Sequence, residues 1–191
     1  MTFPDLVSVF FNTLVERFDL FGALGLTLGF TAGIMPRPQL ILFTSAACAT
    51  CFGAHYALLG STTGVAMCAM SVLQSLVAAR FAQSQARPPW FGGLFAASSL
   101  VIALLVLATW NGWPSAFAGT GALFAMAARL QGSASSMRKL FVCATLFWAG
   151  HNILVGSAFG FACDLLTLSG LGIALSKSER RAIVGGLRRS A

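Results

Sequence analysis

Charged residues are scarce in this sequence. Asp, Glu, Lys and Arg make up 9% of its 191 residues, whereas hydrophobic residues make up 57%. A soluble domain carries roughly a quarter charged residues, so this chain lacks the polar surface that water requires. The scarcity excludes an ordinary soluble globular protein, and a mean hydropathy of +0.83 indicates an integral membrane protein.

Signatures of several other classes are missing as well. No Gly-x-Ser-x-Gly elbow surrounds Ser169 and no phosphate-binding glycine loop occurs, which argues against an enzyme. Five cysteines, an odd number, all fall inside apolar runs, which argues against a disulfide framework. Basic residues stand singly or in pairs between apolar runs, unlike a nucleic-acid interface. We therefore expect no catalysis, no cofactor and no nucleic-acid partner.

The N-terminal segment lacks the basic start of a signal peptide. Its polar residues recur at helical spacing beside phenylalanines and leucines: Asp5, Ser8, Asn12, Glu16 and Asp19. This pattern predicts an amphipathic helix over residues 1–19.

Apolar runs fill the rest of the chain. Seven of them are separated by turn signals and charges, and each is long enough to cross roughly 30 Å of hydrocarbon as a helix. They cover residues 20–36, 39–59, 62–80, 90–110, 114–130, 140–156 and 159–176. We expect an all-α transmembrane fold of seven helices in a multi-pass protein, whose partner is the lipid bilayer.

The basic residues predict the orientation of these helices. If seven runs cross the membrane, eleven Lys and Arg residues fall on one side: Arg37, Arg80, Arg87, Arg129, Arg138, Lys139, Lys177, Arg180, Arg181, Arg188 and Arg189. Arg17 alone falls on the other, so the positive-inside rule predicts an N-terminus outside and a C-terminus in the cytoplasm. The basic tail, residues 178–191, would attract anionic lipid headgroups.

One segment occurs twice. His55-Tyr-Ala-Leu-Leu-Gly-Ser-Thr-Thr-Gly64 recurs 96 residues later as His151-Asn-Ile-Leu-Val-Gly-Ser-Ala-Phe-Gly160, with five of ten positions identical. Either the chain is a duplicated unit or a convenient tight turn arose twice. Duplication predicts a parallel 3+1+3 repeat: three-helix units over residues 20–82 and 112–177, joined by a linker helix over residues 83–111.

The segment His55 to Gly64, the His151-Asn152 pair before Gly156-Ser157, and the basic end resemble the YgjV-type bacterial inner-membrane proteins, over roughly residues 25 to 180. That family is similar in its 3+1+3 layout to SWEET and PQ-loop transporters, and Pro38-Gln39 after Pro36 resembles the PQ signature. The resemblance implies an inner-membrane location, a hinge at Pro36, Pro38 and Gln39, and transport of a small polar solute.

Polar residues within the runs are the candidate substrate-binding residues: His55, Gln74, His151, Asn152 and Asp164. Asp164 is the one acid inside the runs, and it must face protein or water. A turn near Ala158 would bring His151 level with Asp164, in a hydrogen bond that serves either substrate or the structure of the hairpin. His55 has no equivalent acid opposite it, because Cys68 stands there. For Gln74 and Asn152 the alternative is an interhelical hydrogen bond.

Two further patterns leave alternatives open. Gly25, Gly29 and Gly33, with Gly22 nearby, form a small-residue stripe for close packing, inside the first unit or across a dimer face. Cys51 and His55 at i, i+4 supply two metal ligands and need others from another helix, so we expect no metal site.

The function we expect is transport of a small polar solute. The alternative is a non-transporting module that binds a small ligand or a partner protein. The oligomeric state is open.

Overall fold

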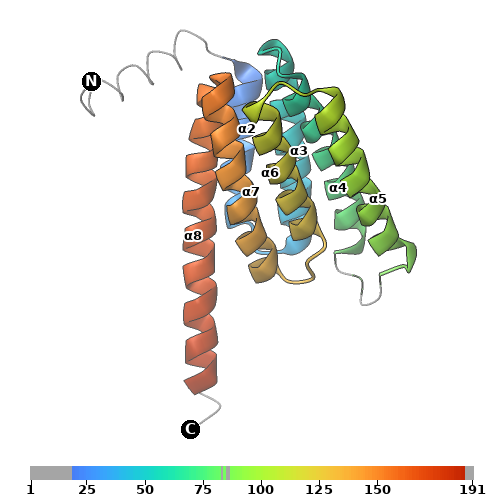
Figure 1. Cartoon of the computed structure of the whole chain (residues 1–191). Coiled ribbons are helices and arrows are strands. Elements are labelled where there is room, and N and C mark those ends of the chain that lie inside the picture. The colour runs from blue at the N-terminus through green and yellow to red at the C-terminus, as the bar shows by residue number, and fades with distance from the viewer. Residues whose placement is uncertain (1–18, 83, 85–86, 188–191) are drawn as a thin grey trace, which may run out of the picture.

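The computed structural model describes residues 19–82, 84 and 87–187, with side chains through residue 178. These residues form seven α-helices and no strand, which confirms the all-α prediction (Figure 1). The helices are α2 (Leu20–Ile34), α3 (Pro38–Leu58), α4 (Thr62–Phe81), α5 (Trp90–Ala108), α6 (Trp113–Arg129), α7 (Ala134–Val155) and α8 (Ala158–Leu187). The amphipathic helix predicted for residues 1–19 lies outside the described residues, except for Asp19.

Four of these helices, α3, α4, α5 and α8, are long and apolar enough to cross a membrane, and α2 is a shorter apolar helix. Two boundaries differ clearly from the prediction. Helix α7 begins at Ala134, because the Ser133 hydroxyl caps it by accepting from the Ser136 N–H at 3.1 Å. Helix α8 continues to Leu187. Charged residues had marked the ends of both predicted runs, but charges do not interrupt backbone hydrogen bonding.

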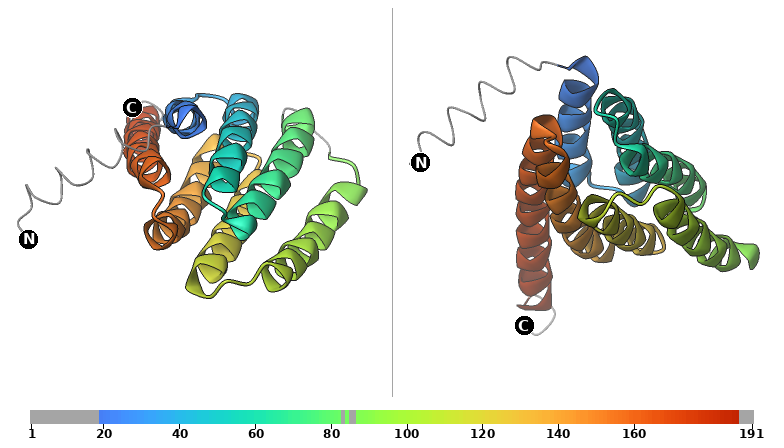
Figure 2. Two further views of the ribbon diagram at one scale, coloured as in Figure 1. Left: turned by 90° about the horizontal axis from the view of Figure 1, so that it is seen from above. Right: turned by 45° about the horizontal axis from the view of Figure 1, so that its top comes forward.

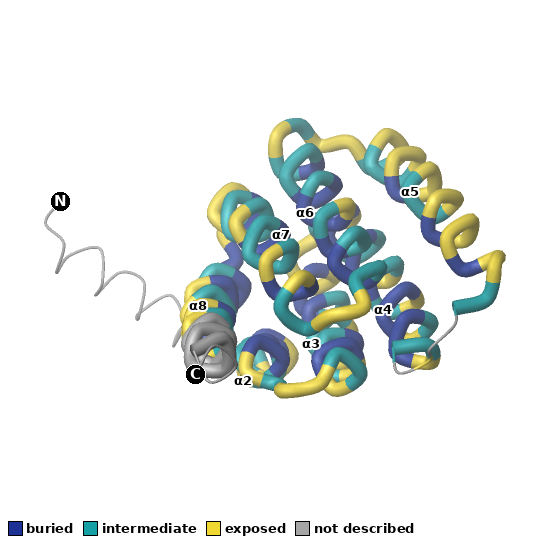
Figure 3. The backbone as a smooth tube through the Cα atoms, turned by 90° about the horizontal axis from the view of Figure 1, so that it is seen from below, coloured by how far each residue is buried: buried dark blue, intermediate teal, exposed yellow. Residues whose placement is uncertain are grey.

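Six of the helices form a closed ring. Its neighbours are α2 and α3, α3 and α4, α4 and α6, α6 and α7, α7 and α8, and finally α8 and α2 (Figure 2). Helix α5 packs outside this ring, against α4 and α6. Buried residues face the interior of the ring, as the view along the helices shows (Figure 3).

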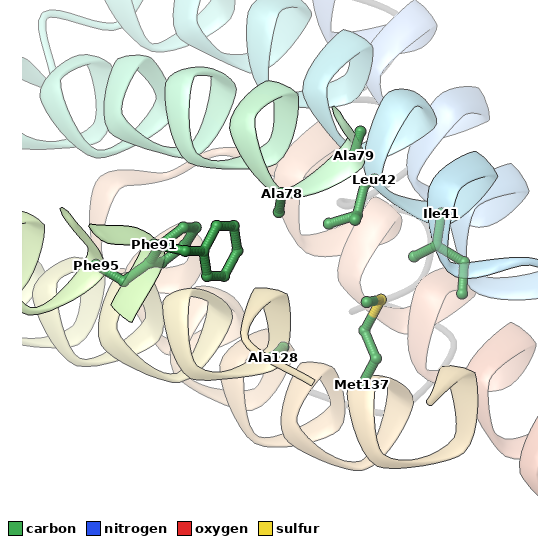
Figure 4. Close-up of a cluster of buried hydrophobic side chains, with 8 residues drawn as sticks. All are labelled: Ile41, Leu42, Ala78, Ala79, Phe91, Phe95, Ala128 and Met137. Carbon is green, nitrogen blue, oxygen red and sulfur yellow. The ribbon is translucent and has the colours of Figure 1, made fainter. Parts of the chain in front are cut away.

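The ring has two ends. The α3–α4 and α7–α8 turns lie at one end, which we call the histidine end because His55 and His151 are close to it. The α2–α3 and α6–α7 turns lie at the other, which we call the arginine end because Arg129 and Arg138 are close to it. At the arginine end a buried apolar cluster joins four ring helices to α5 (Figure 4): Ile41, Leu42, Ala78, Ala79, Phe91, Phe95, Ala128 and Met137.

The glycine stripe of α2 closes the ring. A Cβ atom at Gly29 would overlap Cys163 Sγ, and one at Gly22 would lie 2.8 Å from the Phe159 ring, both on α8. Gly25 instead faces Phe52 of α3. Gly33 also faces α8, at the backbone of Thr167 and Leu171. Packing inside the first unit, the favoured prediction, is therefore correct for Gly25 and wrong for the other three glycines, whose partner helix follows them by more than a hundred residues.

The repeated segment builds the same turn twice. Gly60 and Gly156 have φ of 71° and 70°, a left-handed conformation that glycine adopts without strain. Ser61 and Ser157 then begin the next helices, because their hydroxyls accept from the N–H groups of Gly64 and Gly160. The Gly-Ser-x-x-Gly pattern thus has a local structural role at both places.

Candidate functional site

A cavity of about 150 Å³ lies inside the ring. All six ring helices contribute to its wall, and none of its lining residues comes from α5. Most of the wall is apolar, and it includes four aromatic rings, those of Phe52, Tyr56, Phe141 and Trp148. The polar side chains in the wall are Ser45, Tyr56, Ser71, Arg129, Thr145, Asn152, Asp164 and Thr167. A mostly apolar cavity with a few polar groups is typical of a small-molecule site.

The two halves of the chain line this cavity at matching positions. The lining residues include nine pairs that lie 96 positions apart, the same offset as in the repeated segment. The pairs are Gly29 and Ala125, Gly33 and Arg129, Ser45 and Phe141, Cys48 and Ala144, Ala49 and Thr145, Phe52 and Trp148, Tyr56 and Asn152, Cys68 and Asp164, and Ser71 and Thr167. Equivalent surfaces of both halves therefore face the same space.

Reciprocal hydrogen bonds join the halves at the histidine end. His55 Nε2 lies 2.8 Å from Ser157 Oγ, and His151 Nε2 lies 3.5 Å from Ser61 Oγ. His151 is the counterpart of His55, 96 positions later, and Ser61 is the counterpart of Ser157, 96 positions earlier, so each histidine bonds the serine of the other half. Between them, the Tyr56 hydroxyl donates to Asn152 Oδ1 at 2.7 Å. We call these three contacts the histidine-end latch.

Asp19 supports the latch from the first residue before α2. Its carboxylate accepts from the N–H groups of Phe21 and Gly22 and lies 2.6 Å from His55 Nδ1. Burial acts to raise the pKa of this carboxyl, but the hydrogen bonds from His55, Gly22 and Phe21 outweigh it and hold the pKa below its ordinary value of 3.8. The prediction that His55 lacks an acidic partner is wrong, because the fold returns the start of α2 to the end of α3.

The predicted hydrogen bond between His151 and Asp164 is also wrong. His151 Nδ1 lies 2.9 Å from the Pro114 carbonyl oxygen, at the start of α6. Asn152 donates instead to Asp164, with Nδ2 at 2.7 Å from Oδ2. Asp164 therefore pairs with the residue after His151. A step of one residue turns the side chain by about 100° around the helix, so Asn152 faces α8 where His151 does not.

Arg129 is a buried cation in the cavity wall, with 3% of its surface exposed. Its Nε donates to Ser75 Oγ at 2.8 Å and its Nη1 to Gln74 Oε1 at 3.1 Å. Gln74 in turn donates to Ser98 Oγ of α5 at 2.9 Å. From the sequence, Arg129 was counted only as an orientation signal. Its position inside the apolar run 114–130, one residue from the end, was the one hint that it lies within the bundle.

The structure separates the five predicted substrate-binding residues. Asn152 and Asp164 line the cavity, whereas His55, Gln74 and His151 do not. His55 and His151 belong to the histidine-end latch, and Gln74 holds Arg129. His55 also lines a second cavity of about 150 Å³ beside Asp19 and Ser157.

The predicted hinge residues lie at the arginine end. Pro36 is in the α2–α3 turn, and Pro38 and Gln39 are the first residues of α3. Arg138 Nη2 donates to the Met35 carbonyl oxygen at 2.6 Å and so ties this turn to α7. A hinge at these residues stays a prediction. In the described part of the chain, no three His, Cys, Asp or Glu side chains gather as metal ligands.

The sequence model of one family, Imp-YgjV, described as a bacterial inner membrane protein, matches residues 18–182. The chain belongs to this family, as its sequence predicted. Neither the curated proteins nor the solved structures contain a match.

Proposed function

We propose that this member of the Imp-YgjV family carries a small polar solute across the bacterial inner membrane, through the ring of six helices. The observation that supports transport most directly is the cavity, which both halves of the chain line at positions 96 residues apart. Transporters built from internal repeats bind their solutes at the interface of the repeats. SWEET-like transport, expected from the resemblance, belongs to this proposal.

The repeat itself is the first element of the proposal. We infer two parallel units, α2–α4 and α6–α8, with α5 as the linker that inverts the chain between them. Three features support this arrangement: the twice-built Gly-Ser turn, the reciprocal histidine and serine contacts, and the paired wall of the cavity. A tight turn that arose twice would account for the first feature but not for the other two.

Orientation is the second element. The Lys and Arg residues whose side chains are described all lie at or beyond the arginine end: Arg37, Arg80, Arg87, Arg129, Arg138, Lys139 and Lys177. The positive-inside rule then favours seven crossings with the arginine end in the cytoplasm and the histidine end outside. The helices α6 and α7 carry more polar residues. As members of the ring they would cross the membrane with their polar side chains turned inward, to the cavity and the latch.

The two ends of the cavity are closed by different kinds of contact. The histidine-end latch consists of a few hydrogen bonds, each contributing about 1 kcal/mol. The arginine end is closed by apolar packing around Phe91 and Phe95. A solute pathway would require the two ends to open in turn. Opening the histidine end would break only the few hydrogen bonds of the latch.

The size of the cavity limits the solute. An engineered protein cavity of about 150 Å³ holds a benzene molecule. The cavity in this ring has a similar volume, so the proposed solute has about the size of one small ring or a short chain of three to six heavy atoms.

Uptake by proteoliposomes that contain the purified protein tests the proposal. The radiolabelled probes are acetate, pyruvate, glycine, inorganic phosphate and glucose. Ser45→Phe, which gives α3 the side chain of its counterpart Phe141, fills the cavity and is expected to reduce uptake at least tenfold. Leu104→Phe is the matched control, because Leu104 lies on the exposed face of α5, outside the ring.

Two outcomes would count against transport. Uptake of every probe at the rate of empty liposomes is one, and equal uptake by the Ser45→Phe variant is the other. Co-purification of a stoichiometric partner protein in the absence of uptake would favour the alternative, a non-transporting membrane module.

A further inference from the structure

We infer that Arg129 makes the central cavity a binding site for a small monocarboxylate. This inference names the class of solute for the site and rests on the proposed function only for what happens after binding. The inference is based on a buried guanidinium group in the cavity wall, whose hydrogen-bond partners among the described residues are neutral and not acidic.

No acid neutralises Arg129 in the described part of the chain. The one ion pair found there joins His55 and Asp19 at the histidine end. Asp164 is the one acid among the lining residues, and it accepts a hydrogen bond from Asn152. A charge buried without a counter-charge is costly in a protein, and more so at membrane depth, so such residues mark ligand pathways.

Arg129 and Asp164 are too far apart along the ring to pair directly. Arg129 is the last residue of α6, about 24 Å below the start of that helix, at 1.5 Å per residue. Asp164 lies in the second turn of α8, about 9 Å below its start. Because α6 and α8 both begin at the histidine end, the two backbones differ in depth by about 15 Å, which exceeds the combined reach of the side chains. The two side chains therefore lie at opposite ends of the cavity.

The remaining donors of Arg129 form a fork. Nε and one hydrogen of Nη1 are used by Ser75 and Gln74. No hydrogen bond among the described residues involves Nη2, and this atom is not among the fully buried atoms without a partner. Nη2 and the second hydrogen of Nη1 thus remain as donors for the oxygens of a carboxylate. Gln74 and Ser75 fix the plane of the fork and are positioning residues.

The rest of the wall favours one negative charge on a small organic body. Arg129 supplies one positive charge, so a dianion such as phosphate would leave charge that a single guanidinium group cannot balance. The rings of Phe52, Phe141 and Trp148 offer apolar contact for a short carbon chain.

Ligand binding to the full chain in detergent tests this inference separately from transport. Tryptophan fluorescence, to which Trp148 in the cavity wall contributes, and calorimetry would follow titrations with sodium acetate, sodium pyruvate, acetamide, inorganic phosphate and glucose. We expect saturable binding of acetate or pyruvate, with acetamide, phosphate and glucose at least tenfold weaker. Arg129→Gln should weaken carboxylate binding at least tenfold, whereas Arg80→Gln, at the exposed end of α4, should leave it unchanged.

Ser45→Phe keeps the inference testable if Arg129→Gln does not fold, since it fills the cavity while Arg129 is retained and should abolish carboxylate binding. The inference is overturned if the wild-type protein binds neither carboxylate, if acetamide or phosphate binds as tightly, or if binding survives Ser45→Phe. Carboxylate binding without uptake would sustain the inference and contradict the transport proposal. Uptake that is unchanged in Arg129→Gln would support the transport proposal and contradict the inference about Arg129.

Discussion

The Tyr56 hydroxyl donates a hydrogen bond to the Asn152 side chain at 2.7 Å, and these two residues lie 96 positions apart. They are equivalent positions of the repeated segment, and they meet where the two halves of the ring face each other. Tyr56 also stacks on Trp148, with ring centroids 5.8 Å apart. The centre of the histidine-end latch is therefore a contact between a residue and its own counterpart.

Tyr56→Phe removes this hydrogen bond and keeps the aromatic ring. We expect a loss of about 1 kcal/mol in the free energy of unfolding, typical of one interhelical hydrogen bond. Thermal unfolding in detergent measures it. The control is Thr44→Val, which removes a hydroxyl that bonds only within its own helix, to the Leu40 carbonyl oxygen. Equal melting temperatures for Tyr56→Phe and the wild type would show that the contact does not stabilise the closed ring.

Asp164→Asn and Asp164→Leu distinguish hydrogen bonding from charge. The amide oxygen of the first variant can still accept from Asn152, so its stability should change by less than about 1 kcal/mol. The leucine variant leaves the Asn152 amide without an acceptor, so we expect a loss of about 1 to 3 kcal/mol. Chemical denaturation of both purified variants provides the comparison. A larger loss for Asp164→Asn than for Asp164→Leu would contradict a stabilising role for the hydrogen bond from Asn152.

The Asp19 carboxylate gives stability a defined dependence on pH. Its pKa is lower in the folded protein than the ordinary value of 3.8, so the folded state prefers the ionised form. The resulting stabilisation is fully present above the unfolded pKa and is lost as pH falls through the folded pKa.

Melting temperatures of the wild type and Asp19→Asn between pH 2.5 and 7 measure this effect. We expect the wild type to be the more stable at neutral pH and its advantage to decline below about pH 4. An advantage that stays constant across this range would mean that Asp19 acts through packing and not through its charge.

The contact between α2 and α8 can be tested by overfilling it. Gly29→Ala places a methyl group against Cys163 Sγ, closer than two such atoms can approach, so we expect a loss of about 1 to 3 kcal/mol in the free energy of unfolding. Combining it with Cys163→Ala should restore part of that loss, because the added methyl group then occupies the space of the sulfur. Gly92→Ala is the control, since no atom lies within 4 Å of the Cβ added there. Additive losses in the double variant would place Gly29 away from Cys163.

Most of the helical fold could be predicted from the sequence. The run predicted over 62–80 became α4, because Ser61 caps its start and the apolar residues continue to Arg80. The early start of α7 and the length of α8 were missed, since charged residues were treated as helix ends. Of the candidate site, Asn152 and Asp164 were both named from the sequence, but the hydrogen bond to Asp164 was assigned to His151, whereas Asn152 makes it.

The sequence by itself determined where helices form and that they belong in a membrane, because apolar runs, caps and turn glycines act over neighbouring residues. The tertiary structure alone decided that Asp19 meets His55, that Gly29 meets Cys163, and that Arg129 faces the cavity. Helical periodicity places a side chain on a face of its helix. Which helix covers that face depends on closure of a ring whose contacts join residues up to 138 positions apart, and no local pattern records that closure.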